Sequence, residues 1–135
     1  FHNSFENFEY DLNIVDIDGE TAYEIPRGKK MYVNALNDVI WGRNMNVSIE
    51  ITYLDNSTSP MQLDFIRWNN KGINQHLSRR STTINRTGKG GWNTATITID
   101  DINLDNMEYL GTDFRLYGTV SDIVIKEIKV KEVKE

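Results

Sequence analysis

The sequence predicts an all-β fold: a two-sheet antiparallel β-sandwich with jelly-roll topology. Apolar and polar residues alternate along three long segments, 45–53, 92–99 and 123–133. This period of two places one face of a strand in a core and the other face in water. Threonine, isoleucine, valine and tyrosine are frequent in the predicted strands and favour them. No segment keeps a helical period over three turns.

Shorter strands are predicted between turn-forming residues. In chain order, the predicted strands are 8–14, 22–25, 30–35, 45–53, 62–68, 82–85, 92–99, 114–117 and 123–133. Asp, Asn, Ser, Pro, Lys and Gly cluster between them and predict turns at 18–19, 26–28, 55–57, 69–72 and 88–91. One helical turn is expected over 100–106, and the lysine-rich final strand is typical of a protected sheet edge. About nine strands at such spacing are typical of a sandwich.

The composition is that of a single globular domain spanning residues 1–135. Hydrophobic residues make up 39% and charged residues 26% of the chain, as in ordinary folded domains. The absence of cysteine excludes disulfides and thiolate metal sites, and two histidines make zinc improbable. The chain begins at Phe1 without a signal-like segment or a membrane-spanning run. We therefore expect a fragment of a longer polypeptide, monomeric when isolated and not bound to a membrane.

Charge is segregated along the chain. The formal net charge is −5, yet residues 65–99 contain no Asp or Glu and carry six Lys and Arg. They also include Trp68 and Trp92. A basic, aromatic segment in an acidic protein suggests a site for an anionic or sugar-like ligand. Nucleic acid is disfavoured as a partner, because the sequence pI is about 5.0 and no nucleic-acid-binding motif is present.

Several segments, taken in order, resemble the β-sandwich modules appended to bacterial glycoside hydrolases and polysaccharide lyases. The segments that carry this resemblance are 31–33, 47–55, 92–100, 111–116 and 122–125. The resemblance is to jelly-roll carbohydrate-binding modules, similar in kind to families 6 and 35. It implies a non-catalytic, extracellular module that binds a plant or algal polysaccharide and belongs to the same polypeptide as a catalytic domain.

The resemblance also implies a structural Ca²⁺ between the first and last strands. The family's first strand commonly reads Glu-Ala-Glu, whereas here two residues separate Glu6 from Glu9. Asp122 stands just before the last strand, at the position of the family's terminal Asp. Carboxylate oxygens suit Ca²⁺. The expected calcium ligands are therefore Glu6, Glu9 and Asp122.

The expected sugar site lies around the end of the 62–68 strand. Sugars present apolar C–H faces ringed by hydroxyls, so their sites combine an aromatic ring with hydrogen-bonding groups. Trp68 is the expected stacking platform. Arginine pairs bidentately with carboxylates or sulfates, which suggests an acidic, uronate or sulfated polysaccharide. The expected carbohydrate-binding residues are Arg67, Trp68, Asn69, Asn70, Gln75, Arg79 and Arg80.

Other interpretations stay open at this point. The arginines, Arg86 among them, could instead pair with acidic residues from the flanks, and Trp92 is expected to pack in the core. The chain could be a small polysaccharide lyase, since such enzymes need a group that neutralises a uronate and an acid or base. Candidates for those roles are Arg67, His76, Arg79 and either Tyr53 or Tyr117. It could also be a packing domain without a ligand.

Overall fold

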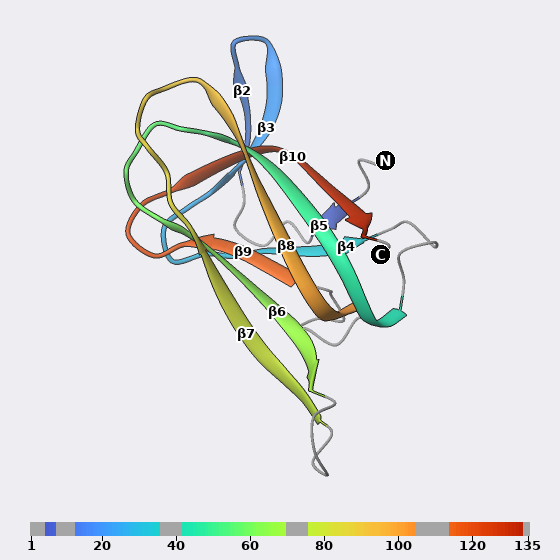
Figure 1. The fold of residues 1–135 in the computed structure, drawn as a ribbon. Helices are drawn as coiled ribbons and strands as arrows, with labels where there is room; N and C mark the ends of the chain where they lie inside the picture. The colour runs from blue at the N-terminus through green and yellow to red at the C-terminus, as the bar shows by residue number, and fades with distance from the viewer. Residues whose placement is uncertain (1–4, 8–12, 36–41, 70–75, 105–113, 134–135) are drawn as a thin grey trace.

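The computed structural model describes residues 5–7, 13–35, 42–69, 76–104 and 114–133. Ten strands run through these residues (Figure 1). They are β1 (Phe5–Asn7), β2 (Asn13–Ile17), β3 (Glu20–Ile25), β4 (Met31–Ala35), β5 (Gly42–Leu54), β6 (Met61–Asn69), β7 (His76–Ile84), β8 (Trp92–Leu104), β9 (Phe114–Gly118) and β10 (Ile123–Glu132). Within this part of the chain, no helix is long and apolar enough to cross a membrane.

The strands form two halves that are linked at one backbone pair. One half has the order β1-β4-β9-β6-β7, the other has the order β8-β5-β10-β3-β2, and the link is Arg67 opposite Ile102. All neighbours are antiparallel. Without β1 and β2, the sheets β4-β9-β6-β7 and β3-β10-β5-β8 have the strand order of a jelly roll. The predicted all-β two-sheet sandwich is confirmed.

The core lies between the two halves and draws on both. Alternation explains its make-up: Met61, Leu63 and Phe65 point inward from β6, while Ile49 and Ile51 point inward from β5. Further buried members come from β3, β4, β7, β8, β9 and β10; they include Ile25, Met31, Val33, Ile84, Ile99, Ile102, Phe114, Leu116, Ile123, Ile125, Ile128 and Val130. One continuous cluster therefore holds the two sheets together by burial of apolar surface.

The β2–β3 hairpin projects beyond the sandwich (Figure 1). Its turn is the predicted one: Asp18 and Gly19 both have positive φ, 52° and 82°, as a two-residue hairpin turn requires. Ile14 in β2 is 60% exposed, so β2 adds little to the core, whereas β3 contributes Ile25 to it.

Two sequence predictions are wrong in their bounds. The helical turn expected over 100–106 does not form in its described part, because β8 continues as a strand to Leu104. The strand expected at 82–85 is longer and begins at His76. In both cases pairing with a neighbouring strand extends the element: Gly42 lies opposite Leu104, and Asn69 lies opposite His76. Of the strand expected at 8–14, residues 8–12 lie outside the described residues.

Candidate functional site

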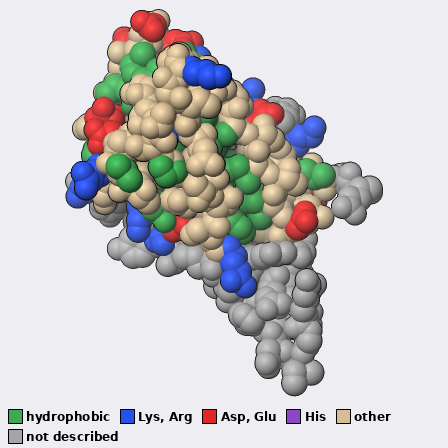
Figure 2. All heavy atoms as spheres, turned by 60° about the vertical axis from the view of Figure 1, so that its left-hand side comes forward, with side chains coloured by type: hydrophobic (Ala, Val, Ile, Leu, Met, Phe, Trp, Pro, Cys, Tyr) green, Lys and Arg blue, Asp and Glu red, His purple; other side chains and the backbone are tan. Residues whose placement is uncertain are grey.

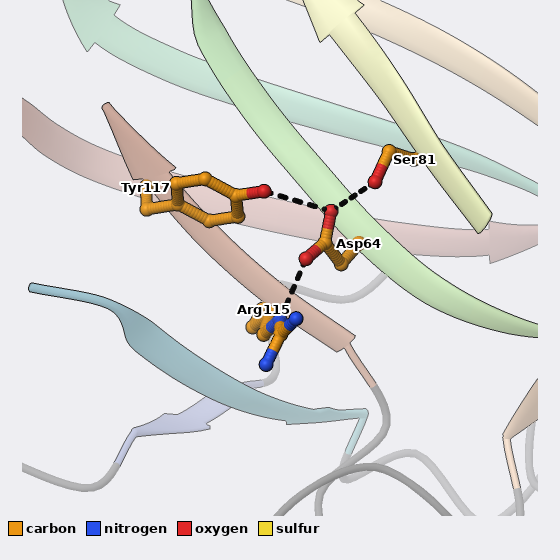
Figure 3. A network of polar contacts seen from close by, with 4 residues as sticks. All are labelled: Asp64, Ser81, Arg115 and Tyr117. Atoms are coloured by element: carbon orange, nitrogen blue, oxygen red, sulfur yellow. Dashed lines mark hydrogen bonds and ion pairs between the residues drawn. The ribbon is translucent and has the colours of Figure 1, made fainter. Parts of the chain in front are cut away.

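A polar network lies on the outer face of the sheet that contains β6, β7 and β9 (Figure 3). Its position follows from strand alternation. Because Leu63 and Phe65 face the core, Asp64 between them faces outward. The ladder sets Asp64 opposite Ser81 of β7 on one side and opposite Arg115 of β9 on the other.

Asp64 is the centre of this network and is only 2% exposed. Its Oδ2 lies 2.7 Å from Arg115 Nε, and Tyr117 donates its hydroxyl hydrogen to Oδ1 over 3.1 Å. Ser81 donates to the same Oδ1. These contacts from two neighbouring strands fix the carboxylate, the guanidinium and the phenol relative to one another.

The network shifts the acidity of its members. Burial alone would raise the pKa of Asp64, but the hydrogen bond from Ser81 and the charge and hydrogen bond of Arg115 outweigh it, so this pKa is lowered. Burial raises the pKa of Tyr117, and the negative charge of Asp64 adds to that shift. Near neutral pH, Asp64 is therefore ionised and Tyr117 keeps its hydroxyl hydrogen.

Further polar side chains extend the network along the same face. Gln62 exchanges hydrogen bonds with Thr83 at 2.9 and 3.1 Å, and Lys30 Nζ lies 5.0 Å from the centre of the Tyr117 ring. We call this surface the Asp64 face; its described members are Lys30, Gln62, Asp64, Ser81, Thr83, Arg115 and Tyr117. It combines an aromatic ring, cations, amides and hydroxyls.

The sequence-predicted sugar site is divided between the two faces of β6 and β7. Arg67, Trp68, Asn69 and Arg79 are described through their backbone alone. Position 68 is two residues beyond Ile66, and position 79 lies opposite Ile66. Both positions therefore belong to the face that carries Asp64.

The remaining predicted residues are described only in part. Positions 67 and 69 alternate to the opposite side of β6, and Arg80 lies opposite the core residue Phe65. Arg80 is exposed because β7 is a sheet edge in the described part of the chain. Asn70 and Gln75 lie outside the described residues. Positions 79 and 80 are consecutive in β7, so the strand alternates between its two faces from one to the other.

Arg86 is buried, so it is not a surface arginine that reads a ligand. Its side chain donates to the Ser59 carbonyl oxygen over 2.7 Å, to Asn56 Oδ1 over 3.3 Å and to Ser121 Oγ over 2.6 Å. The residue is 4% exposed, and burial lowers the pKa of its guanidinium. A Cβ at Gly118 would overlap the carbonyl oxygen of Ser121, so glycine there permits the tight turn that presents Ser121.

Asp55 binds the loop after β7, close to Arg86. Its Oδ1 accepts the backbone N–H groups of Thr87 and Gly88, both over 2.9 Å, and its Oδ2 accepts the Thr87 hydroxyl. The Thr87 hydroxyl hydrogen bond is the main reason that the pKa of Asp55 is lowered. Asp55 is 1% exposed. We call these contacts of Asp55 and Arg86 the loop clamp, because they join the loops after β5, β7 and β9.

The three expected calcium ligands are not brought together in what the structure describes. Asp122 is exposed, and its Oδ1 accepts the backbone N–H of Arg27 over 2.6 Å. Glu6 lies in β1 opposite Asn34, and Glu9 lies outside the described residues. Among the residues whose placement is described, no group of three or more His, Cys, Asp or Glu lies close enough to hold a metal ion.

Trp92 is half-buried at the start of β8 and is absent from the buried core, contrary to the expectation from sequence. Lys126 Nζ lies 5.3 Å from the centre of its ring and 2.7 Å from Glu20 Oε2. Figure 2, which brings the left-hand side of Figure 1 forward, shows charged side chains scattered around the margin of that view.

Sequence reasoning missed Asp64 and Arg115 as members of a candidate site. One signal for Asp64 was available: a charged residue at a polar position of the alternating segment 61–65, directly before the acid-free stretch. Arg115 shows the same alternation in Phe114–Gly118. Their partnership depends on the pairing of β6 with β9, some fifty residues apart, which the sequence does not reveal.

No protein-family model matches the sequence, and no curated protein matches it. Solved structures do match it. The chain aligns with the CBM22-1 xylan-binding domain of Paenibacillus barcinonensis Xyn10C at a TM-score of 0.52 and 14% identity, over 97% of this chain and 86% of that one. A second structure, "Family 16 Carbohydrate Binding Module-2", aligns at a TM-score of 0.49 and 13% identity, over 95% of this chain and 90% of that one. The first likeness and the strand order agree: this chain has the fold of a jelly-roll carbohydrate-binding module.

Proposed function

We propose that this chain is a non-catalytic carbohydrate-binding module and that the Asp64 face holds the polysaccharide. The observation that supports this most is the buried Asp64, which orients Arg115 and Tyr117 on the outside of a sheet. A carboxylate buried on an outward face costs free energy unless it is hydrogen-bonded. Here that carboxylate holds two potential sugar contacts in place.

The chemistry of the face suits a sugar chain. The Tyr117 ring offers an apolar surface for C–H groups, and the amide of Gln62 and the hydroxyl of Thr83 can donate and accept hydrogen bonds. Because Arg115 and Tyr117 are already fixed by Asp64, little side-chain entropy is lost on binding. A short site of this kind binds weakly for each sugar unit, as is useful for a module that must release and rebind.

The sequence-derived platform extends this surface. Positions 68 and 79 belong to the Asp64 face, so Trp68 would stack against a sugar and Arg79 would add a cation to those of Lys30 and Arg115. The negative charge of Asp64 is balanced by its ion pair with Arg115, so this carboxylate does not oppose an anionic ligand. An acidic polysaccharide, with uronate or sulfate groups, is therefore the ligand class that we propose for this face.

The biological role would be to concentrate a catalytic domain of the same secreted polypeptide on its substrate. Tethering raises the effective concentration of the second domain at the polymer surface. We retain the calcium proposal for Glu6, Glu9 and Asp122 as a structural role that supports the fold.

Affinity electrophoresis tests the proposal. The protein is run through gels that contain pectin, alginate, xylan, mannan or a sulfated glycan, and we expect retardation on at least one acidic polymer. Arg115→Gln should reduce retardation several-fold, and Lys131→Gln on the other sheet removes the same charge and should not. No retardation on any gel would favour a packing domain. A rise in ultraviolet absorbance from an unsaturated uronide would favour the lyase.

A further inference from the structure

A groove lies on the other side of β6 and β7, between these strands and β8. This groove of about 250 Å³ is lined by Phe65, Thr82, Ile97, Thr98, Ile99 and Asp100. Phe65 and Thr82 sit next to Asp64 and Ser81 in sequence but face the opposite way. The groove is therefore separate from the Asp64 face, although the same two strands build both surfaces.

The groove stays open because its borders are sheet edges. In the described part of the chain, β7 pairs with β6 alone, and β8 meets β6 at the single pair Arg67 and Ile102. The remaining backbone N–H and C=O groups along this side of β8 have no strand partner there. A sheet edge offers such groups to a ligand that can hydrogen-bond.

The groove is lined by both apolar and polar groups. Phe65 and Ile99 belong to the core and are 7% and 5% exposed, so they give the groove an apolar floor. Thr82 is half-buried and points into this side of β7, while Asp100 is exposed. An apolar floor with hydroxyl, carboxylate and backbone groups at its rim matches a sugar ring, whose C–H face is surrounded by hydroxyls.

The size of the groove limits the ligand. Sites for drug-sized ligands have volumes of roughly 300–1,000 Å³, and this groove is slightly smaller. One sugar ring fits this volume better than a chain segment does. We propose that the groove is a second carbohydrate site that takes a single sugar unit, the chain end or a side branch of the polysaccharide. This inference rests on the proposed function and adds a separate subsite to it.

NMR titration tests the groove directly. The ¹⁵N- and methyl-labelled chain is titrated with D-xylose, D-mannose, D-galactose and D-glucuronic acid. We expect at least one sugar to cause saturable shifts of the Thr82, Thr98 and Asp100 amides and of the Ile97 methyls. Absence of saturable shifts there with all four sugars overturns the inference.

Substitutions assign the shifts to the groove. Thr82→Trp fills it and should abolish them, Thr82→Val removes one hydroxyl and should weaken binding several-fold, and Thr82→Ser should retain it. Thr96→Val is the matched control, because Thr96 lies in β8 but does not line the groove. The folded state of each variant is checked by its own spectrum. Groove shifts that persist in Thr82→Trp overturn the inference. Shifts that appear without sugar when the protein concentration rises also overturn it, because they would show that the groove binds a second copy of the chain.

The same experiment separates the two proposals. Gel retardation without groove shifts overturns the groove and leaves the Asp64 face intact. Groove shifts in a protein that no gel retards overturn the Asp64 face as the polysaccharide site and leave the groove standing.

Discussion

Two aspartates are buried in the described part of the chain, each with an arginine nearby, and the two arrangements differ in what they hold. Asp64 binds side chains of neighbouring strands on the outside of a sheet, Arg115 among them. Asp55 binds the backbone N–H groups of one loop, and Arg86 beside it reaches a carbonyl and two side chains of two others. Both aspartates are nearly inaccessible and both have a lowered pKa. Burial and acidity alone therefore do not mark a ligand site.

The two aspartates differ in the groups that bind them. Contacts from a side chain to loop backbone fix the chain itself, so we interpret the loop clamp as structural. Contacts among side chains on a sheet face leave the backbone unchanged and fix the surface that a ligand would meet. Substitutions in one region, compared with the other region or with an exposed residue, test this difference.

The largest expected effect is on stability, from Arg86→Met in the loop clamp. The substitution removes the donor of three hydrogen bonds, to Ser59, Asn56 and Ser121, at a position where Arg86 itself is buried. We expect a loss of about 2–4 kcal/mol in the free energy of unfolding, measured by the urea midpoint. Arg80→Met is the matched control because Arg80 is exposed, and it should change stability by less than about 0.5 kcal/mol. Equal effects of the two variants would contradict the structural role of the clamp.

Acid should destabilise both regions in the same direction. The folded-state pKa of Asp55 and of Asp64 lies below the ordinary value of about 3.9 for aspartate. Their ionised forms therefore stabilise the fold fully above that value, and this stabilisation is lost as the pH falls through the lowered pKa. Calorimetry should show a melting temperature that is nearly constant around pH 6 and falls steeply below about pH 4. A shallower fall in Asp64→Asn than in the wild type would assign part of the loss to that group, and an identical fall would refute the assignment.

Calcium removal should have a smaller effect. If Glu6, Glu9 and Asp122 hold Ca²⁺, a chelator lowers the melting temperature, because a ligand that binds the native state alone stabilises it. Asp122→Asn should abolish the response. A chelator response that survives in Asp122→Asn would remove this residue from the ligand set.

The smallest effect is expected at an exposed charge cluster. Lys126 contacts Glu20 and the Trp92 ring with partial exposure, and such contacts contribute about 0.5–1 kcal/mol or less. Lys126→Met should therefore shift the urea midpoint far less than Arg86→Met does. A comparable shift would mean that burial does not explain the difference between the two cations.

Sequence reasoning predicted the fold better than the site, for a physical reason. Alternation is local, so Met45–Tyr53 and Trp92–Ile99 could be identified as strands without knowing their partners. The Asp64 network depends on register between β6 and β9, and register is a long-range property. The loop after β7 shows the same limit: Arg86 and Lys89 have equal charge in sequence, yet the structure buries Arg86 and exposes Lys89.

The most direct test of the Asp64 face as the carbohydrate site compares Asp64→Asn with Asp55→Asn in the same affinity gel that retards the wild type. Both variants lose one buried carboxylate, and calorimetry confirms that each is folded under the conditions of the gel. We expect Asp64→Asn to lose most of the retardation, because Arg115 and Tyr117 are no longer held, and Asp55→Asn to keep it. Retention of binding in Asp64→Asn, or an equal loss in both variants, would contradict the Asp64 face as the carbohydrate site.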